Sequence, residues 1–183
     1  MREILVVALK EELSGADIYC GIGRRSGYNL SSFLENRGPY PLPKKVINYG
    51  TCGTFIKGLR GLHKISTFSN REEDQGDGLG LRLLTQEKFV TEIIPGYDLV
   101  DCEAFYLKQI CDKREIEFEC YKYITDEVGK NTKQDWANGM REGEACYREY
   151  LTKDMSKLIT KYISHTKNSK IQLLEKLHIG NWR

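Results

Sequence analysis

The sequence predicts an α/β fold of three layers, αβα, with a central mixed, mostly parallel sheet. Short β-branched runs alternate with stretches of helical periodicity, the order produced by parallel strands joined through helices. The chain has 183 residues, which lets one domain bury a core of its own. We expect a single domain over residues 1–164 and a C-terminal tail or helix over 165–183.

Five runs have the pattern of strands and four have the pattern of helices. The first strand is the apolar run that begins at Ile4, and the others are likewise short and bounded by breakers. The predicted strands are 3–8, 46–50, 62–68, 97–101 and 119–124. The predicted helices are 26–36, 102–114, 134–150 and 152–164. Between Glu103 and Lys113 apolar residues recur at helical spacing, which gives that helix one face suited to packing on a sheet.

Composition narrows the class of protein. Charged residues make up 30% of the chain and the net charge is only +2, so neither nucleic acid nor an anionic membrane is expected as the main partner. No apolar run approaches the roughly 20 residues of a membrane span. The N-terminal strand pattern begins without an export signal, and we expect a cytoplasmic location.

Cysteine and histidine spacing argues against a metal site. The six cysteines form no Cys-x-x-Cys pair, and the three histidines lack the spacing of metal ligands. We therefore expect reduced, mostly buried cysteines, and neither a metal nor an organic cofactor. The glycine-rich stretch 74–80 holds two aspartates, but not in the order of a calcium loop, and is interpreted as a solvated surface loop.

Polar side chains follow the predicted strands, where open α/β sheets bind their ligands. Glu12 follows the first strand, Thr51 lies in a glycine turn after the second, Glu103 follows the fourth and Asp126 the fifth. Each has a plain structural reading, as a helix-dipole partner, a cap or a turn residue. Their convergence at one sheet edge favours chemistry instead, because clustered carboxylates shift one another's pKa or bind positive charge.

Cleavage of a glycosidic bond uses such a set of groups. Positive charge develops on the sugar in the transition state, and carboxylates can stabilise it or activate water. A further acid can protonate the departing base.

Four segments in order resemble the methylthioadenosine/S-adenosylhomocysteine nucleosidases of the nucleoside phosphorylase/nucleosidase superfamily. Residues 4–13 resemble their first strand and Glu-rich turn, and 46–55 their Asn-x-Gly-Ser-Ala-Gly turn. Residues 100–104 resemble their Val-Glu-Met-Glu-Ala signature, and 124–126 their Ile-Ser-Asp signature. The resemblance implies a phosphorylase/hydrolase-like fold, and hydrolysis of the N-glycosidic bond of a purine nucleoside, with release of free base and ribose moiety.

The resemblance implies a role for each matching residue. Glu12 would activate the attacking water, Glu103 would hold the ribose hydroxyls and stabilise the sugar cation, and Asp126 would protonate the purine imidazole ring. Phe89 would stack on the purine and Trp136 would close the site, although both also suit ordinary core packing. The implied substrate-binding residues are Thr51, Cys52, Gly53, Phe89, Cys102, Thr125 and Trp136.

Three alternatives stay open. The related phosphorylases place an arginine before the glycine turn, whereas Asn48 stands here, which favours hydrolysis over phosphorolysis. Arg24 and Arg25 are candidates to bind phosphate, inorganic or on a nucleotide, and are otherwise a solvated pair. A nucleoside phosphorylase, a nucleoside monophosphate glycosidase and a non-catalytic nucleoside-binding module therefore remain as alternatives.

The chain departs from the family in two shortened segments. The stretch between Leu13 and Gly21 has no room for a β-hairpin, and most of a substrate-covering segment is missing between Phe68 and Thr85. In the family these pieces contribute to the 5′ subsite and the dimer contact. We still expect a homo-oligomer, a dimer or higher, that acts on a purine nucleoside or nucleotide.

Overall fold

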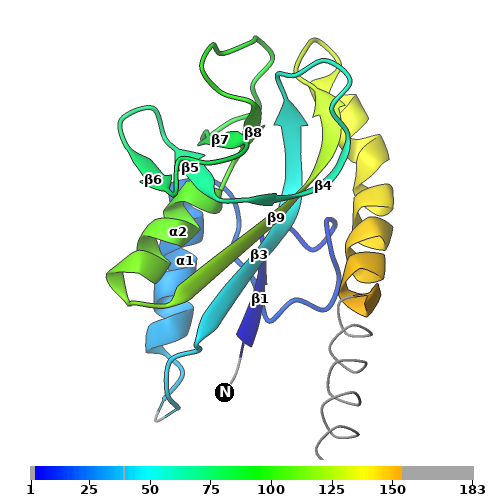
Figure 1. The fold of residues 1–183 in the computed structure, drawn as a ribbon. Helices are drawn as coiled ribbons and strands as arrows, with labels where there is room; N and C mark the ends of the chain where they lie inside the picture. Colours follow the sequence, from blue (N-terminus) through cyan, green and yellow to red (C-terminus); the bar gives the residue numbers. More distant parts are fainter. Residues whose placement is uncertain (1–2, 39, 154–183) are drawn as a thin grey trace, which may run out of the picture. The chain divides into compact units, whose positions relative to one another are not determined.

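The computed structural model describes residues 3–38 and 40–153 (Figure 1). The chain divides into two compact units, Met1–Cys146 and Tyr147–Arg183. Only residues 147–153 of the second unit are described, and they are helical. The predicted helix over 152–164 falls mostly outside the described residues, and the predicted tail over 165–183 falls wholly outside them.

A mixed sheet forms the middle of the first unit. Its strands are β1 (Glu3–Val7), β2 (Ile18–Tyr19), β3 (Lys45–Thr54), β4 (Gly61–Ile65), β5 (Thr67–Ser69), β6 (Asp74–Gly76), β7 (Arg82–Thr85), β8 (Leu99–Asp101) and β9 (Glu117–Glu127). The main path runs β2-β1-β3-β8-β7-β5-β6, with β9 beside β3 and β4 beside β9. Among the described residues, five of the eight strand pairings are parallel, which confirms the predicted sheet.

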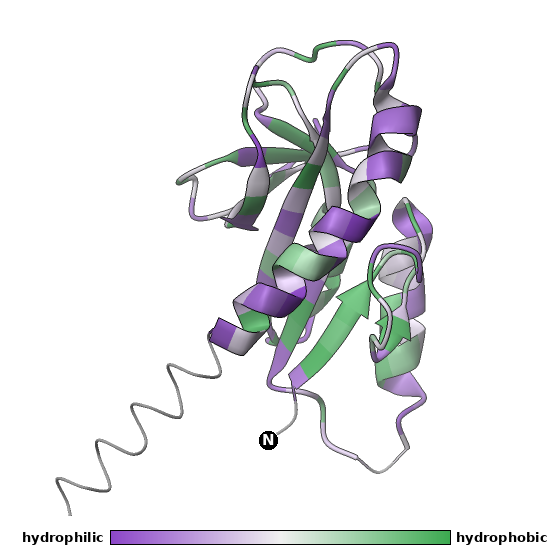
Figure 2. Ribbon diagram, turned by 90° about the vertical axis from the view of Figure 1, so that its right-hand side faces the viewer, coloured by the Kyte–Doolittle hydropathy of each residue, from purple (hydrophilic) through white to green (hydrophobic). Residues whose placement is uncertain are grey.

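The long strands β3 and β9 form the centre of the sheet (Figure 1). They pair in parallel over nearly their whole length, and β3 pairs with β1 and β8 along its other edge. Most positions along β3 are buried, and Figure 2 shows hydrophobic and hydrophilic segments mixed along the central strands. The buried positions of these strands therefore include polar residues, among them Asn48, Thr51 and Lys122.

Helices cover both faces of the sheet in the first unit. α1 (Arg24–Glu35) and α2 (Ala104–Lys113) pack together, and Gly27 lets them approach, since a Cβ there would lie 3.2 Å from the carbonyl oxygen of Tyr106. A third helix begins at residue 132 on the other face. Its Gly143 faces the central strands, because a Cβ there would lie 2.8 Å from Tyr49 Oη. The predicted three-layer fold is confirmed.

Two apolar clusters hold the helices to the sheet. One joins α1 and α2 to β1 and β3 through residues such as Leu30, Leu107 and Val46. The other places Phe105 of α2 against Leu83 and Ile124. Burying a side chain of this size contributes about 1.5–3 kcal/mol, so these clusters fix where the strand ends lie.

The predicted elements differ from the observed ones mainly at short strands. The predicted strand over 62–68 is two strands, β4 and β5, interrupted at Ser66, and the sequence pattern did not indicate β2, β6 or β7. These three strands have two to four residues each, too few for an alternating pattern to stand out. The predicted helix over 134–150 starts at residue 132 and continues through residue 153.

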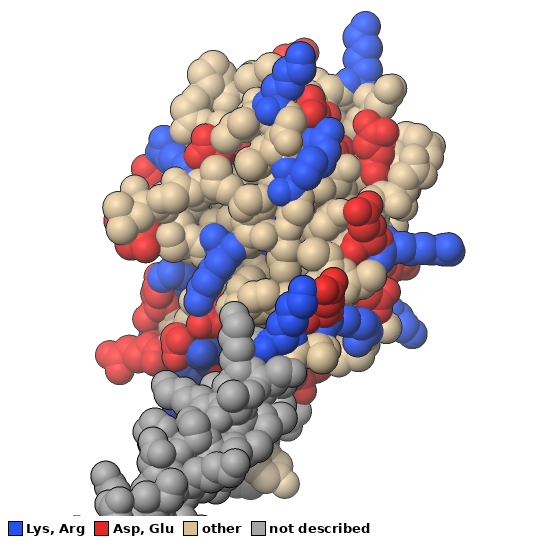
Figure 3. All heavy atoms as spheres, turned by 45° about the vertical axis from the view of Figure 1, so that its right-hand side comes forward, with Lys and Arg blue, Asp and Glu red and all other residues tan. Residues whose placement is uncertain are grey.

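The described residues include no helix that is long and apolar enough to cross a membrane. On the face shown in Figure 3, acidic and basic side chains are interspersed.

Candidate active site

A pocket opens at the carboxyl ends of β1, β3, β8 and β9, the edge at which the sequence places the candidate groups. It brings together most of the predicted site residues. Those that line it are Glu12, Thr51, Cys52, Gly53, Phe89, Cys102, Glu103, Asp126 and Trp136. The three acids come from distant parts of the chain and are each less than 5% exposed.

Glu12 is held in place by three hydrogen bonds. Its Oε1 accepts from the backbone N–H of Thr51 at 2.9 Å and from Thr51 Oγ1 at 2.5 Å. Its Oε2 accepts from the backbone N–H of Leu9 at 3.2 Å. Donors aimed at both oxygens suit an ionised carboxylate, and they leave lone pairs of Oε2 available to a further donor. Glu12 therefore has the form of a base presented to the pocket.

Glu103 lies at the start of α2 and forms an ion pair with a buried lysine. Lys122 of β9 is completely buried, contacts Glu103 Oε1, and places its Nζ 2.8 Å from Asp101 Oδ2. Burial raises the pKa of Glu103, and the negative charges of Asp101 and Glu12 add to the rise, while Lys122 opposes it. Burial alone would lower the pKa of Lys122, but the two carboxylates raise it well above its usual value. The lysine therefore remains protonated.

Asp101 anchors this ion pair to the fold. Its Oδ1 accepts from Thr85 Oγ1 at 2.6 Å, and its Oδ2 accepts from the backbone N–H of Ala104 at 2.9 Å. The second bond satisfies a free N–H of the first turn of α2. Asp101 thus ties β7, β8 and α2 to the charge that neutralises Glu103.

Gly50 gives the ion pair the space that it occupies. A Cβ at this position would lie 2.7 Å from Glu103 Oε1 and 2.8 Å from Lys122 Nζ. We expect Gly50→Ala to lower the free energy of unfolding by about 1–3 kcal/mol, because the buried pair has to shift. Urea unfolding measures the change. The control is Gly129→Ala, whose Cβ would meet nothing closer than 3.8 Å, and an equal loss in both variants would contradict the prediction.

Asp126 reaches the pocket through an irregularity in β9. The pairing of β3 with β9 shifts between Cys52 and Gly53, so Gly53 lies opposite Asp126 and Thr125 is an extra residue. Such bulges re-aim side chains beside active sites. A Cβ on Gly53 would lie 3.0 Å from Asp126 Oδ2, so glycine leaves this oxygen its room.

The surroundings of the Asp126 carboxyl favour its protonated form. Its Oδ1 accepts from Thr125 Oγ1 at 2.7 Å, whereas Oδ2 is buried and makes no hydrogen bond to any described residue. Burial raises the pKa of Asp126, the negative charge of Asp135 adds to the rise, and the hydroxyls of Thr125 and Thr132 oppose it. A raised pKa on a carboxyl that lines the pocket is what a general acid requires.

Two aromatic side chains line the outer part of the pocket. The rings of Phe89 and Trp136 meet edge to face, with centroids 5.3 Å apart. Trp136 Nε1 also donates to Thr51 Oγ1 at 2.8 Å. Phe89 is 40% exposed and is not a core residue, so it is available to stack on a flat ligand.

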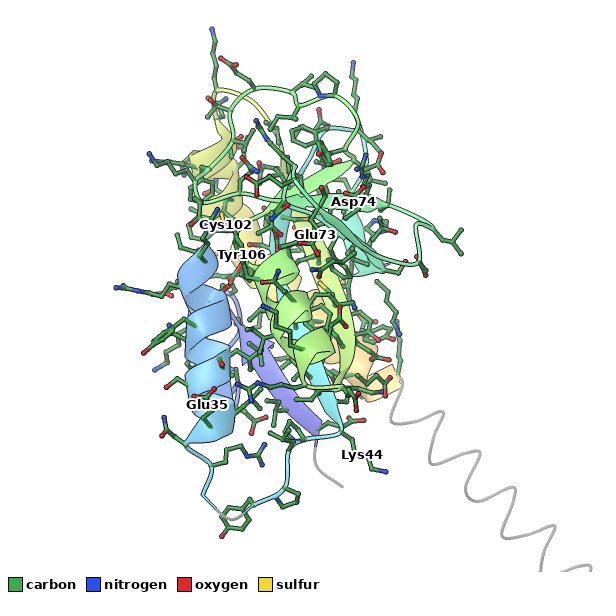
Figure 4. The ribbon with its side chains drawn as sticks, turned by 90° about the vertical axis from the view of Figure 1, so that its left-hand side faces the viewer. Glu35, Lys44, Glu73, Asp74, Cys102 and Tyr106 are labelled. Carbon is green, nitrogen blue, oxygen red and sulfur yellow. The ribbon has the colours of Figure 1, made fainter. Side chains whose placement is uncertain are left out.

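The remaining predicted residues divide between lining and support. Cys52 and Cys102 line the pocket, and burial raises the pKa of both thiols, which keeps them neutral. Figure 4 shows Cys102 near the N-terminal ends of α1 and α2, whereas Glu35 lies at the opposite end of α1. Thr125 does not line the pocket, but its hydroxyl donates to Asp126.

Arg24 and Arg25 lie outside this pocket. Arg25 is exposed, and the Arg24 side chain is 77% exposed with its Nε 3.5 Å from Glu87 Oε1. The Glu87 carboxylate also accepts from the backbone N–H of Arg24 at 3.3 Å and from Tyr106 Oη at 2.8 Å. The first turn of α1, a usual position for an anion, is therefore occupied by a carboxylate of the chain itself.

Sequence reasoning missed Lys122, Asp101 and Glu87. A lysine inside a strand whose neighbours are apolar or aromatic was the available signal for Lys122, since such a residue is rarely buried without a charged partner. The available signal for Asp101 was its position directly before the predicted helix over 102–114, from which an aspartate can accept a hydrogen bond from a backbone N–H of the first turn. No metal-binding cluster of His, Cys, Asp or Glu occurs within residues 3–38 and 40–153.

The similarity of this chain to known proteins lies in its structure and not in its sequence. No protein-family model matches the chain, and no curated protein matches it. A methylthioadenosine/S-adenosylhomocysteine nucleosidase from Chlamydia trachomatis superposes with a TM-score of 0.69 at 12% identity, over 85% of this chain and 97% of that one. The Helicobacter pylori nucleosidase, an aspartate-to-asparagine mutant with 5′-methylthioadenosine in the active site, gives 0.69 at 12% identity, over 85% and 98%.

The chain has the methylthioadenosine/S-adenosylhomocysteine nucleosidase fold. A third example is the S. pneumoniae nucleosidase with a transition-state inhibitor, at a TM-score of 0.66 and 12% identity, over 82% of this chain and 97% of that one. The superposition covers nearly the whole length of these three enzymes, although their sequences differ strongly from this one.

Proposed function

We propose that this protein is an enzyme that hydrolyses the N-glycosidic bond of a purine nucleoside, of the methylthioadenosine/S-adenosylhomocysteine type or a modified purine nucleoside. The observation that carries the proposal is the convergence of Glu12, Glu103 and Asp126 on one pocket, each nearly buried. A binding protein has no need for a base, a sugar-side carboxylate and an acid together. Cleavage of a sugar–base bond needs all three.

Each acid supplies one part of the reaction. Glu12 accepts a proton from water as the water attacks the anomeric carbon. Glu103, which pairs with Lys122, accepts hydrogen bonds from the ribose hydroxyls and stabilises the positive charge that develops on the sugar. Asp126 donates its proton to the imidazole ring of the purine, so the base departs without a full negative charge.

The apolar part of the pocket suits a purine. Phe89 and Trp136 offer ring faces beside Asp126, and Cys102 lies on the sugar side between Asp101 and Glu103. Among proteins of this fold, the C. trachomatis nucleosidase has been solved bound to adenine and, as a mutant, to methylthioadenosine. These ligands support a purine nucleoside as the substrate class.

Hydrolysis is favoured over phosphorolysis by the surroundings of Asn48 in β3, whose continuation through residues 50–54 replaces the predicted glycine turn, and by those of Arg24 in α1. Asn48 is completely buried and its amide donates to the carbonyl oxygens of Val6 and Tyr49, at 3.2 and 3.3 Å. Arg24 is paired with Glu87, which itself occupies the start of α1. Neither side chain is placed to bind a phosphate dianion in the pocket.

We expect base release to be independent of phosphate. Purine nucleosides, their 5′-thio derivatives and nucleoside monophosphates are incubated with the protein with and without phosphate, and free base is measured by chromatography. Release at equal rates in both buffers supports hydrolysis. A rate that requires phosphate would identify a phosphorylase, release from monophosphates alone a nucleotide glycosidase, and binding without release a binding module.

We further propose that the enzyme works in the cytoplasm as a homo-oligomer, without a cofactor. The six cysteines are free, as expected of a protein that stays in a reducing compartment. Self-association would bury exposed apolar side chains such as Leu79 and Ile93, which are 69% and 68% exposed. Sedimentation velocity measures the oligomeric state.

A further inference from the structure

We propose that Trp136 is a positioning residue for Glu12 and acts through the hydroxyl of Thr51. This inference rests on the proposed function, because it assigns Glu12 the role of the base. Trp136 lies 124 residues from Glu12 in the chain, and the third helix carries it to the mouth of the pocket.

The hydrogen bonds between these residues run in one direction only. An indole N–H can only donate, and an ionised carboxylate can only accept. The Thr51 hydroxyl lies between them, 2.8 Å from Trp136 Nε1 and 2.5 Å from Glu12 Oε1. It therefore accepts from the indole and gives its single proton to the carboxylate. The indole fixes which way that proton points.

The location of Thr51 makes this connection consequential. Thr51 is 6% exposed, and its backbone N–H also donates to Glu12 Oε1. Without the indole, the hydroxyl is free to rotate and to offer its proton elsewhere in the pocket. Glu12 would then keep a backbone contact at each oxygen but lose the hydroxyl bond to Oε1, so Oε2 would face the attacking water at a less constant angle.

The same indole also forms part of the aromatic wall. Its ring meets Phe89 edge to face, and Phe89 is partly exposed at the pocket mouth. A single side chain therefore contributes both to the aromatic wall and to the hydrogen bond that orients Thr51. A phenylalanine at position 136 could close the mouth but could not donate.

The test is a double-mutant cycle on the full chain with a nucleoside that the enzyme cleaves. Trp136→Phe retains the ring and removes the donor, and we expect it to lower kcat about tenfold while KM changes less than about twofold. In a Thr51→Val background the same change should alter kcat less than about twofold, since the connection is already broken. In a Thr51→Ser background, which keeps the hydroxyl, the tenfold loss should return.

Several outcomes overturn the proposal. A rise in KM with unchanged kcat would show that Trp136 only stacks on the base. Equal losses in the Thr51→Val and Thr51→Ser backgrounds would show that no signal passes through the hydroxyl. Absence of base release by the unmodified chain overturns the proposed function and this inference together, whereas a cleaving enzyme with an unaffected Trp136→Phe variant overturns the inference alone.

A spectroscopic measurement covers the case in which Trp136→Phe does not fold. The chain has two tryptophans, so Trp182→Phe leaves Trp136 as the single emitter. In that background we expect Thr51→Val to shift the emission maximum, because the indole N–H loses its partner, and Thr51→Ser to leave it in place. Identical spectra for the two variants would contradict the hydrogen bond.

Discussion

Asp126→Asn is expected to lower kcat about 10³-fold and to leave KM within about threefold of the unmodified enzyme. The amide preserves the shape of the side chain but has no acidic proton to give to the purine as the bond breaks. Because that proton is needed in the transition state and not in the bound substrate, the loss falls on turnover. Steady-state release of free base measures both constants, and a loss confined to KM would remove Asp126 from the mechanism.

The pH profile gives an independent check on this residue. Burial holds the pKa of Asp126 above that of an ordinary aspartate, so on the alkaline side of the profile kcat/KM should fall as pH rises through this raised value. The falling limb should be absent from Asp126→Asn. A matched control is Asp135→Asn, which removes a charge that raises the pKa of Asp126 without lining the pocket. It should keep kcat and move the limb to lower pH.

Stability should change in the opposite sense to activity. The folded pKa of Asp126 lies above its unfolded value, so its contribution to stability is fully present below the ordinary pKa of aspartate and is lost as pH rises through the folded pKa. At neutral pH the carboxyl is a cost to the fold that the neutral amide avoids. Asp126→Asn should therefore resist urea better than the unmodified enzyme at pH 7.

Lys122→Met is expected to lower the free energy of unfolding by about 3–5 kcal/mol. The substitution leaves two carboxylates, Asp101 and Glu103, buried beside each other without a cation. Domains of this kind have total stabilities of about 5–15 kcal/mol, so the loss is a large fraction of the whole. Urea unfolding measures it.

Two further variants separate the buried pair from a general effect of losing a lysine. Lys64 of β4 is 55% exposed and lies 2.9 Å from Glu119, so Lys64→Met should cost only about 0–1 kcal/mol. Adding Asp101→Asn and Glu103→Gln to Lys122→Met should restore part of the loss, since the buried charges are then gone. Equal losses for the two lysines, or no recovery in the triple variant, would contradict the assigned pairing.

The sequence located the site because parallel strands share an edge. Glu12 and Asp126 each follow a predicted strand, and topology brings such residues to one edge of the sheet, although Asp126 lies inside the longer observed strand β9. Phe89 and Trp136 came only from the resemblance to a family, since no periodicity distinguishes a wall residue from a core residue.

Other features depend on contacts that no local pattern records. Glu87 accepts a hydrogen bond from the backbone N–H of Arg24, the first residue of α1, 63 residues earlier in the chain. The sequence around Glu87 gives no indication of this contact. From the sequence alone, Lys122 resembles a solvent-exposed lysine on a strand. Its burial follows from its pairing with Asp101 and Glu103, which only the three-dimensional structure shows. The short strand β7 was missed because Leu83 and Leu84 form too brief an apolar run to be distinguished from a buried loop.

The shift in pairing after Cys52 has a consequence for how proteins of this fold can diverge. Side chains along a strand alternate between faces, so one surplus residue reverses the alternation for everything beyond it. The core around Ile124 is indifferent to that surplus, because it lies before the shift. Asp126, the proposed proton donor, lies beyond the shift and depends on it. A relative that lost a single residue at this point could keep the same core and the same thermal stability. Its carboxyl would point away from the nucleoside, so the protein would keep its fold but lack catalytic activity.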